Sequence, residues 1–232
     1  MLVKFKGGKM KKMIVLVLLG VLFTTTLLAG EISVFGFYNA SNMMSGKSDL
    51  SIEAFLAGTD VSLGELDGKI KYDMEATGGL GLGVEYTENL NENMNWVAGA
   101  SYEMSREFKD KKVKFDFVGD FEMKGELALL SLFANLNYLI NENVYLLGGI
   151  SYALSTGNND ITGGLGYQIG AGYMINEQLS IEGIYKIQNL TLAISDKADF
   201  VDPVFGNLDL KYDLDATEVS LAGLQVFMKY RL

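Results

Sequence analysis

Residues 130–154 read LSLFANLNYLINENVYLLGGISYAL, which is two alternating stretches joined by a short Asn-Glu turn. Every second residue is apolar before the turn, and the alternation resumes after it. The apolar set is Leu130, Leu132, Ala134, Leu136, Tyr138 and Ile140, then Val144, Leu146, Gly148, Ile150, Tyr152 and Leu154. A period of two residues is the period of a β-strand, so this stretch predicts a hairpin rather than a helix.

The same turn occurs twice more, at Asn91-Glu92 and at Asn176-Glu177, and alternating stretches flank both copies. A further alternating stretch ends the chain with Val226, Met228 and Tyr230. Tight turns at one end and longer connections at the other are typical of an up-and-down antiparallel β-barrel in an outer membrane. Three such turns, with both termini on the same side, predict eight strands. The first strand must pair with the eighth, because an open edge in lipid leaves backbone groups unsatisfied.

The two faces of the expected strands differ in chemistry. One face is apolar and uncharged, whereas the other is rich in Gly and carries six charged residues. We expect these six to form a charge cluster in the lumen: Glu85, Glu103, Glu182, Lys186, Lys229 and Arg231. The interior of an eight-stranded barrel is only just wide enough for side chains to fill it. The large apolar side chains therefore cannot fit inside, and we expect them to face lipid. The Gly-x-Gly stretches at 78–83 and 163–166 then indicate close packing in the lumen.

Aromatic residues gather near both ends of the apolar face. Trp and Tyr are enriched at the two membrane–water interfaces of such barrels. The sequence predicts one girdle near the turns, formed by Tyr86, Trp96, Tyr138, Tyr173 and Tyr230, and a second at the other end, formed by Tyr102, Tyr152 and Tyr185.

The amino terminus has the design of a secretory signal peptide. Lys11 and Lys12 precede an uncharged apolar stretch at 13–28, and the small residues Ala29 and Gly30 follow. We expect cleavage near Gly30, a translation start at Met10, and one mature domain at 31–232. Residues 1–30 hold five of the 19 basic residues and none of the 29 acidic ones. The mature charge is then 14 − 29, or −15, which argues against nucleic acid as a partner.

The first strand is expected at about 32–42, and its facing stays open because both alternating sets carry apolar groups. Outer connections are expected at about 45–68, 107–121, 157–162 and 196–206. The stretch from Lys71 to Thr77 (KYDMEAT) resembles the one from Lys211 to Thr217 (KYDLDAT). Both alternate, so we expect strand extensions that project beyond the membrane with an acidic rim.

The signal peptide, the turns and the amphipathic terminal strand together resemble the small outer-membrane β-barrel family that includes OmpX, the opacity proteins and the OmpA membrane domain. The resemblance implies a location in the outer membrane of a Gram-negative envelope, contact with its lipid and assembly by the barrel-assembly machinery. The terminal strand departs from the family pattern in one respect, because it ends in Leu232 rather than an aromatic residue.

Three functional classes follow from this architecture. The first is a non-enzymatic structural or adhesin-like barrel, whose loops and protruding strands contact a surface or host protein. The second is a narrow porin-like channel for ions or small solutes. The third is an envelope enzyme, which the sequence disfavours because it contains no His and no Cys, the usual general base and activated nucleophile. We expect no catalytic residue, no cofactor and no metal site, since no spacing of the acidic residues matches a known calcium loop.

Overall fold

The computed structural model describes residues 30–59, 61–107, 111–115, 119–123, 126–156, 161–202 and 206–232. The expected signal peptide and translation start lie outside these residues, apart from Gly30 at its end. Within the described ranges, no helix is long and apolar enough to cross a membrane.

The described residues form β-strands joined by turns. The strands are β1 (Glu31–Leu56), β2 (Ser62–Ala76), β3 (Gly79–Asn91), β4 (Met94–Glu107), β5 (Lys111–Phe115), β6 (Gly119–Met123), β7 (Glu126–Leu139), β8 (Val144–Ser155), β9 (Ile161–Thr162), β10 (Gly164–Met174), β11 (Leu179–Asp202) and β12 (Gly206–Arg231).

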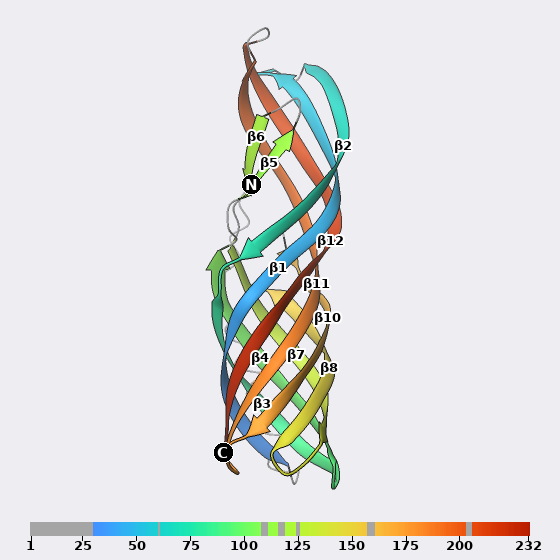
Figure 1. Ribbon diagram of the computed structural model, residues 1–232. Helices are drawn as coiled ribbons and strands as arrows, with labels where there is room; N and C mark the ends of the chain where they lie inside the picture. Colours follow the sequence, from blue (N-terminus) through green and yellow to red (C-terminus); the bar gives the residue numbers. More distant parts are fainter. Residues whose placement is uncertain are drawn as a thin grey trace, which may run out of the picture.

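Eight of these strands close into an antiparallel barrel in the order β10-β8-β7-β4-β3-β1-β12-β11 (Figure 1). Pairing of β10 with β11 completes the ring, in register from Gly166 opposite Gln188 to Met174 opposite Ser180. The first strand pairs with the last, with Val34 opposite Tyr230. The predicted eight-stranded barrel is confirmed, and its closure leaves no open edge around the ring.

The three Asn-Glu turns lie together at one end of the barrel, and the asparagine side chain organises each of them. The Asn141 Oδ1 atom accepts hydrogen bonds from the backbone N–H groups of Asn143 and Val144, both at 2.9 Å. Asn176 accepts from Gln178 at 2.9 Å and from Leu179 at 2.8 Å in the same way. Such side-chain bonds favour a tight turn over continued strand, which is why the alternation breaks at these asparagines.

The apolar face points out of the barrel. Leu146 and Ile150 on β8 are 49% and 55% exposed, whereas Ser151, which directly follows Ile150 and lies on the opposite face of the strand, is 3% exposed. An apolar belt of this extent is unfavourable in water and suits contact with lipid. The expected facing of the strands is therefore confirmed.

The facing of the first strand, which the sequence left open, changes at a bulge. Phe35, Phe37 and Asn39 are buried in the lumen. The register shifts between Asn39 and Ser41, and the next buried side chains are Asn42 and Met44. The inward set therefore changes parity at the bulge, so a single alternation cannot describe β1.

Three strands continue far beyond the barrel. β1 and β12 have 26 residues each, and β11 has 24. A strand needs about 9–11 residues to span a membrane. With β2, these strands form a projecting sheet in the order β2-β1-β12-β11, visible above the barrel in Figure 1. The two expected extensions at 71–77 and 211–217 lie within this sheet, apart from Thr77.

The structure corrects the expected outer connections at 45–68 and 196–206. Strand pairing continues through most of both segments, with Glu53 opposite Glu65 and Asp199 opposite Asp209. Local polarity suggested loops, but the paired backbone of the neighbouring strand supports an extended conformation. In the connection expected at 107–121, β5 and β6 form a separate hairpin.

Candidate functional site: the filled lumen and the projecting sheet

The inward side chains of β12 order the lumen into layers. From the turn end outward they are Lys229, Phe227, Gln225, Leu221 and Val219, all buried. Side chains from other strands join each of these levels, as Glu85 and Glu182 join Lys229 and as Phe37 joins Phe227. The lumen therefore has an ionic layer near the turns, an aromatic layer, a polar layer and an outer apolar layer.

The ionic layer joins two carboxylates through one ammonium group. Lys229 Nζ lies 2.7 Å from Glu85 Oε2 and 2.7 Å from Glu182 Oε1. The Tyr145 hydroxyl donates a 2.6 Å hydrogen bond to Glu182 Oε1. All of these side chains are less than a tenth exposed. Buried charges need partners of this kind, since an unpaired ion in a low-dielectric interior is costly.

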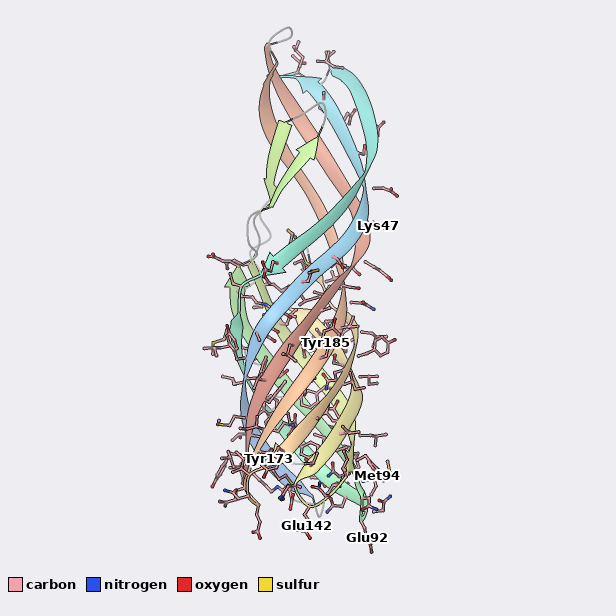
Figure 2. The ribbon with its side chains drawn as sticks, in the orientation of Figure 1. Lys47, Glu92, Met94, Glu142, Tyr173 and Tyr185 are labelled. Carbon is pink, nitrogen blue, oxygen red and sulfur yellow. The ribbon has the colours of Figure 1, made fainter. Side chains whose placement is uncertain are left out.

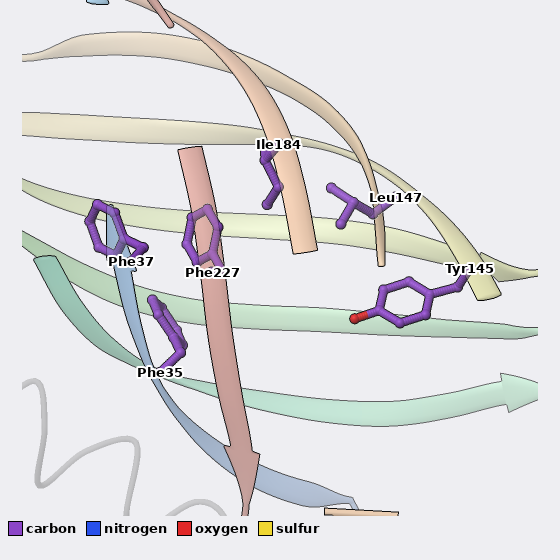
Figure 3. Packing of buried hydrophobic residues seen from close by; sticks show 6 residues of the cluster. All are labelled: Phe35, Phe37, Tyr145, Leu147, Ile184 and Phe227. Carbon is purple, nitrogen blue, oxygen red and sulfur yellow. The ribbon is translucent and has the colours of Figure 1, made fainter. Parts of the chain in front are cut away.

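The aromatic layer crosses the lumen next to the ions, and Figure 3 shows its phenylalanine rings. The rings of Phe37 and Phe227 stack with centroids 4.9 Å apart, and Phe35 lies 5.6 Å from Phe227 at a tilt. Gly81 and Gly83 on β3 stand opposite Phe37 and Phe35, and a Cβ at either glycine would collide with the facing ring. This confirms close lumen packing at this Gly-x-Gly stretch.

The polar layer contains a second ion pair that the sequence did not indicate. Arg106 on β4 lies 2.5 Å from Glu103, although residues three apart in a strand normally face opposite sides. A register shift between these residues turns both side chains inward. Lys186 donates a 3.2 Å hydrogen bond to the Ser131 hydroxyl in the same region. Only the bulge reveals Arg106 as a lumen residue, and no sequence signal marks that bulge.

An outer apolar layer lies beyond the polar one. Six side chains there are at most 4% exposed: Met44, Leu127, Leu129, Leu190, Val219 and Leu221. The strand register brings four of them onto neighbouring positions, since Met44 faces Leu221 across β1 and β12 and Leu190 faces Val219 across β11 and β12.

The six residues expected to share one lumen cluster occupy three places. Glu85, Glu182 and Lys229 form the ionic layer, while Glu103 and Lys186 lie in the polar layer beyond the aromatic rings. Arg231 lies at the turn end, where its Nε is 3.0 Å from Glu31 and its side chain is 38% exposed.

Most of the expected girdle aromatics are exposed on the outside. Those between 38% and 52% exposed are Tyr102, Tyr138, Tyr152, Tyr173, Tyr185 and Tyr230. Figure 2 shows Tyr173 near the turn end and Tyr185 farther toward the projecting sheet. Trp96 is half-buried. Tyr86 differs, because it is 5% exposed and packs against the Trp96 ring at 5.5 Å and against Gly30.

The projecting sheet is the second candidate site, because its outer strands have one paired side each. Among the described residues, β2 pairs only with β1, and β11 beyond Leu192 pairs only with β12. Such strands leave a row of backbone N–H and C=O groups available to another chain. The stretches 47–76 and 193–218 together hold 14 acidic residues and five lysines. Within the described residues, no group of three or more acidic side chains is placed to hold a metal ion.

Several solved structures are similar to this chain. Ail, the attachment invasion locus protein of Yersinia pestis, is 16% identical, and the match covers 88% of this chain and 100% of that chain with a TM-score of 0.34. OprG from Pseudomonas aeruginosa is 17% identical over 88% of this chain and 96% of its own, with a TM-score of 0.35. The outer membrane protease OmpT from Escherichia coli is 13% identical over 88% and 99%, with a TM-score of 0.36.

No protein-family model and no curated protein sequence matches the chain. The architecture follows from the chain's own strand pairing and surface. Eight antiparallel strands close into a ring, apolar side chains form its outer belt, and charged and aromatic side chains fill its interior. The chain therefore has the architecture of a small transmembrane β-barrel.

Proposed function

We propose that this protein is a non-enzymatic, sealed barrel that acts at the cell surface through its projecting sheet. The observation that carries this proposal is the length of β1, β11 and β12, which reach well past the barrel and end in a four-stranded sheet. A barrel that only had to cross the membrane would not need strands of 24–26 residues.

The contents of the lumen support a sealed interior. The ionic layer and the aromatic layer follow each other directly along β12, at Lys229 and Phe227. An ion that crossed would have to displace the stacked rings of Phe37 and Phe227 and separate Lys229 from its two carboxylates. Each step exposes a buried charge or a packed aromatic surface, so the layers oppose conduction.

The sheet edges support an interaction role. An extended segment of another protein can add to an exposed strand, with main-chain hydrogen bonds supplying affinity. The excess of acidic residues in the projecting stretches favours basic partners and disfavours stacking of like copies. A surface or host protein with an extended basic segment fits both features.

A trimmed barrel tests this proposal. Residues 47–71 and 196–212 are each replaced by Asn-Gly, which joins the paired positions Gly46 and Tyr72, and Ser195 and Asp213, through a two-residue hairpin turn. Cells that display the full protein should adhere to cultured host cells or immobilised extracellular proteins several-fold better than cells that display the trimmed form.

The control for this comparison is the barrel itself, which must remain heat-modifiable on gels in both forms. Equal adherence of the two forms, or no gain from the full protein over cells without it, contradicts the proposal. Large, stable currents through the native protein favour the alternative of a narrow channel.

A further inference from the structure

A cavity of about 210 Å³ opens at the turn end of the lumen. Its deep wall includes Glu85, Glu182 and Lys229, and the exposed Glu177 of the β10–β11 turn also lines it. Neither the sealed lumen nor the projecting sheet accounts for this space.

Oxygen atoms without hydrogen-bond partners gather around the cavity. Glu182 Oε2 has no partner although the residue is 1% exposed, because both contacts of that carboxylate use the other oxygen. Asn137 Oδ1 also lacks a partner in a residue that is 7% exposed, and so does Asn95 Oδ1. All three residues line the cavity. Buried acceptors need donors, so a ligand held in this cavity must supply N–H or O–H groups.

The charges of the lining residues also favour a cationic ligand. Four carboxylates line the cavity, from Glu31, Glu85, Glu177 and Glu182, against the two cations Lys229 and Arg231. The net charge of −2 attracts a cation. A cation is therefore favoured at the turn end of the lumen.

The size and walls of the cavity limit the ligand. At about 210 Å³ the space is smaller than the pocket that a drug-sized ligand occupies. Leu139, Met174 and Leu179 supply apolar wall next to the polar groups. A primary ammonium group carries N–H donors and a positive charge, so it suits both the acceptors and the net charge of the lining. A short alkyl stem then suits the apolar wall.

We propose that this cavity binds a small alkylammonium ion, with the Glu182 carboxylate and the Asn137 amide oxygen as its deep acceptors and Glu177 at its mouth. A linear diamine matches this arrangement best, because one ammonium group reaches the deep acceptors while the other stays near the carboxylates of the turn end.

The test is calorimetric titration of the detergent-purified full protein with 1,4-diaminobutane. Tetramethylammonium, which has no N–H donor, should bind at least 10-fold more weakly. E182Q keeps the size of the side chain and removes its charge, and it should weaken diamine binding by about 10-fold or more, as expected for loss of a hydrogen bond to a charged group.

E182Q alters a buried lumen residue, so a matched pair of variants in the exposed turns tests diamine binding without disturbing the packing of the lumen. Glu177 and Glu142 hold the same position in two Asn-Glu turns, but only Glu177 lines the cavity. E177Q should weaken diamine binding several-fold, whereas E142Q should leave it unchanged. Absence of diamine binding to the native protein, equal binding by E177Q and E142Q, or tighter binding of Ca²⁺ than of the diamine would each overturn the proposal.

Discussion

The ammonium group of Lys229 lies 2.7 Å from a carboxylate oxygen of Glu85, although 144 positions separate the two residues in the chain. Strand β1 lies between β12 and β3 in the barrel, so the pair reaches across a whole strand on the lumen side. Lys229 also lies 5.7 Å from the centre of the Phe35 ring on that intervening strand. The first, second and last barrel strands in sequence are thus joined inside the barrel as well as through their backbone pairing.

Replacing Lys229 by Met should lower the free energy of unfolding by about 3–5 kcal/mol, because it leaves two buried carboxylates without their cation. The triple change K229M/E85Q/E182Q should recover most of this loss, since it removes all three charges. Urea unfolding followed by the fluorescence of Trp96, the single tryptophan of the chain, measures both. A K229M barrel as stable as the native one would show that the ion cluster contributes little.

The outer face predicts a depth-dependent response to charge. Ile150 is 55% exposed in the middle of β8, and Ile150→Arg should cost about 2–4 kcal/mol, the cost of a charge near the middle of the bilayer. Leu90 is 55% exposed next to a turn, so Leu90→Arg should cost no more than about 1 kcal/mol, because the charge reaches the interface. Refolding yield and urea stability in bilayers separate the two, and equal costs would contradict the assigned membrane position.

The three turns should differ in their dependence on asparagine. Asn141 and Asn176 each accept two backbone hydrogen bonds, whereas the structure gives Asn91 one, from the N–H of Asn93. At about 0.5–1.5 kcal/mol per bond, Asn141→Ala and Asn176→Ala should each destabilise the barrel more than Asn91→Ala. Glu142→Ala, next to Asn141, is the control and should be neutral. The order of the three unfolding midpoints in urea checks this, and a larger effect at Asn91 would contradict it.

Much of the barrel was predictable from the sequence, because closure in lipid forces a strict alternation. The turns at Asn91, Asn141 and Asn176 fixed the strand count, and the uncharged face fixed which side meets lipid. The alternation along each strand also assigned Glu85, Glu182 and Lys229 to the lumen face. Their mutual contact was not predictable, because it depends on the register of β1 between their strands.

Bulges account for most of what the sequence could not show. A single extra residue reverses the facing of every side chain after it. Both alternating sets of β1 carry apolar groups because Phe35 and Phe37 fill the lumen while Val34 and Tyr38 face outward, and the bulge after Asn39 then changes the alternation. The bulge between Glu103 and Arg106 hid the second ion pair. The projecting sheet was only partly foreseen, because polar segments such as 45–68 take their extended form from the neighbouring strand rather than from local pattern.

The aromatic layer predicts a specific way to open the barrel. Phe37→Ala combined with Phe227→Ala removes the stacked pair while Lys229 and its carboxylates stay in place. Each deletion should cost about 3–5 kcal/mol, the usual cost of Phe to Ala in a packed interior. Thermal shift of the heat-modifiable band on gels measures this loss, and Val34→Ala, on the exposed face of the same strand, is the control.

Single-molecule conductance in planar bilayers tests the central claim most directly. The native protein should show no stable ion-conducting state, only small or rare steps, because the ionic and aromatic layers fill the lumen. The F37A/F227A variant should show steps that are larger and more frequent. Large, reproducible currents through the native barrel would contradict a sealed lumen and identify the protein as a channel.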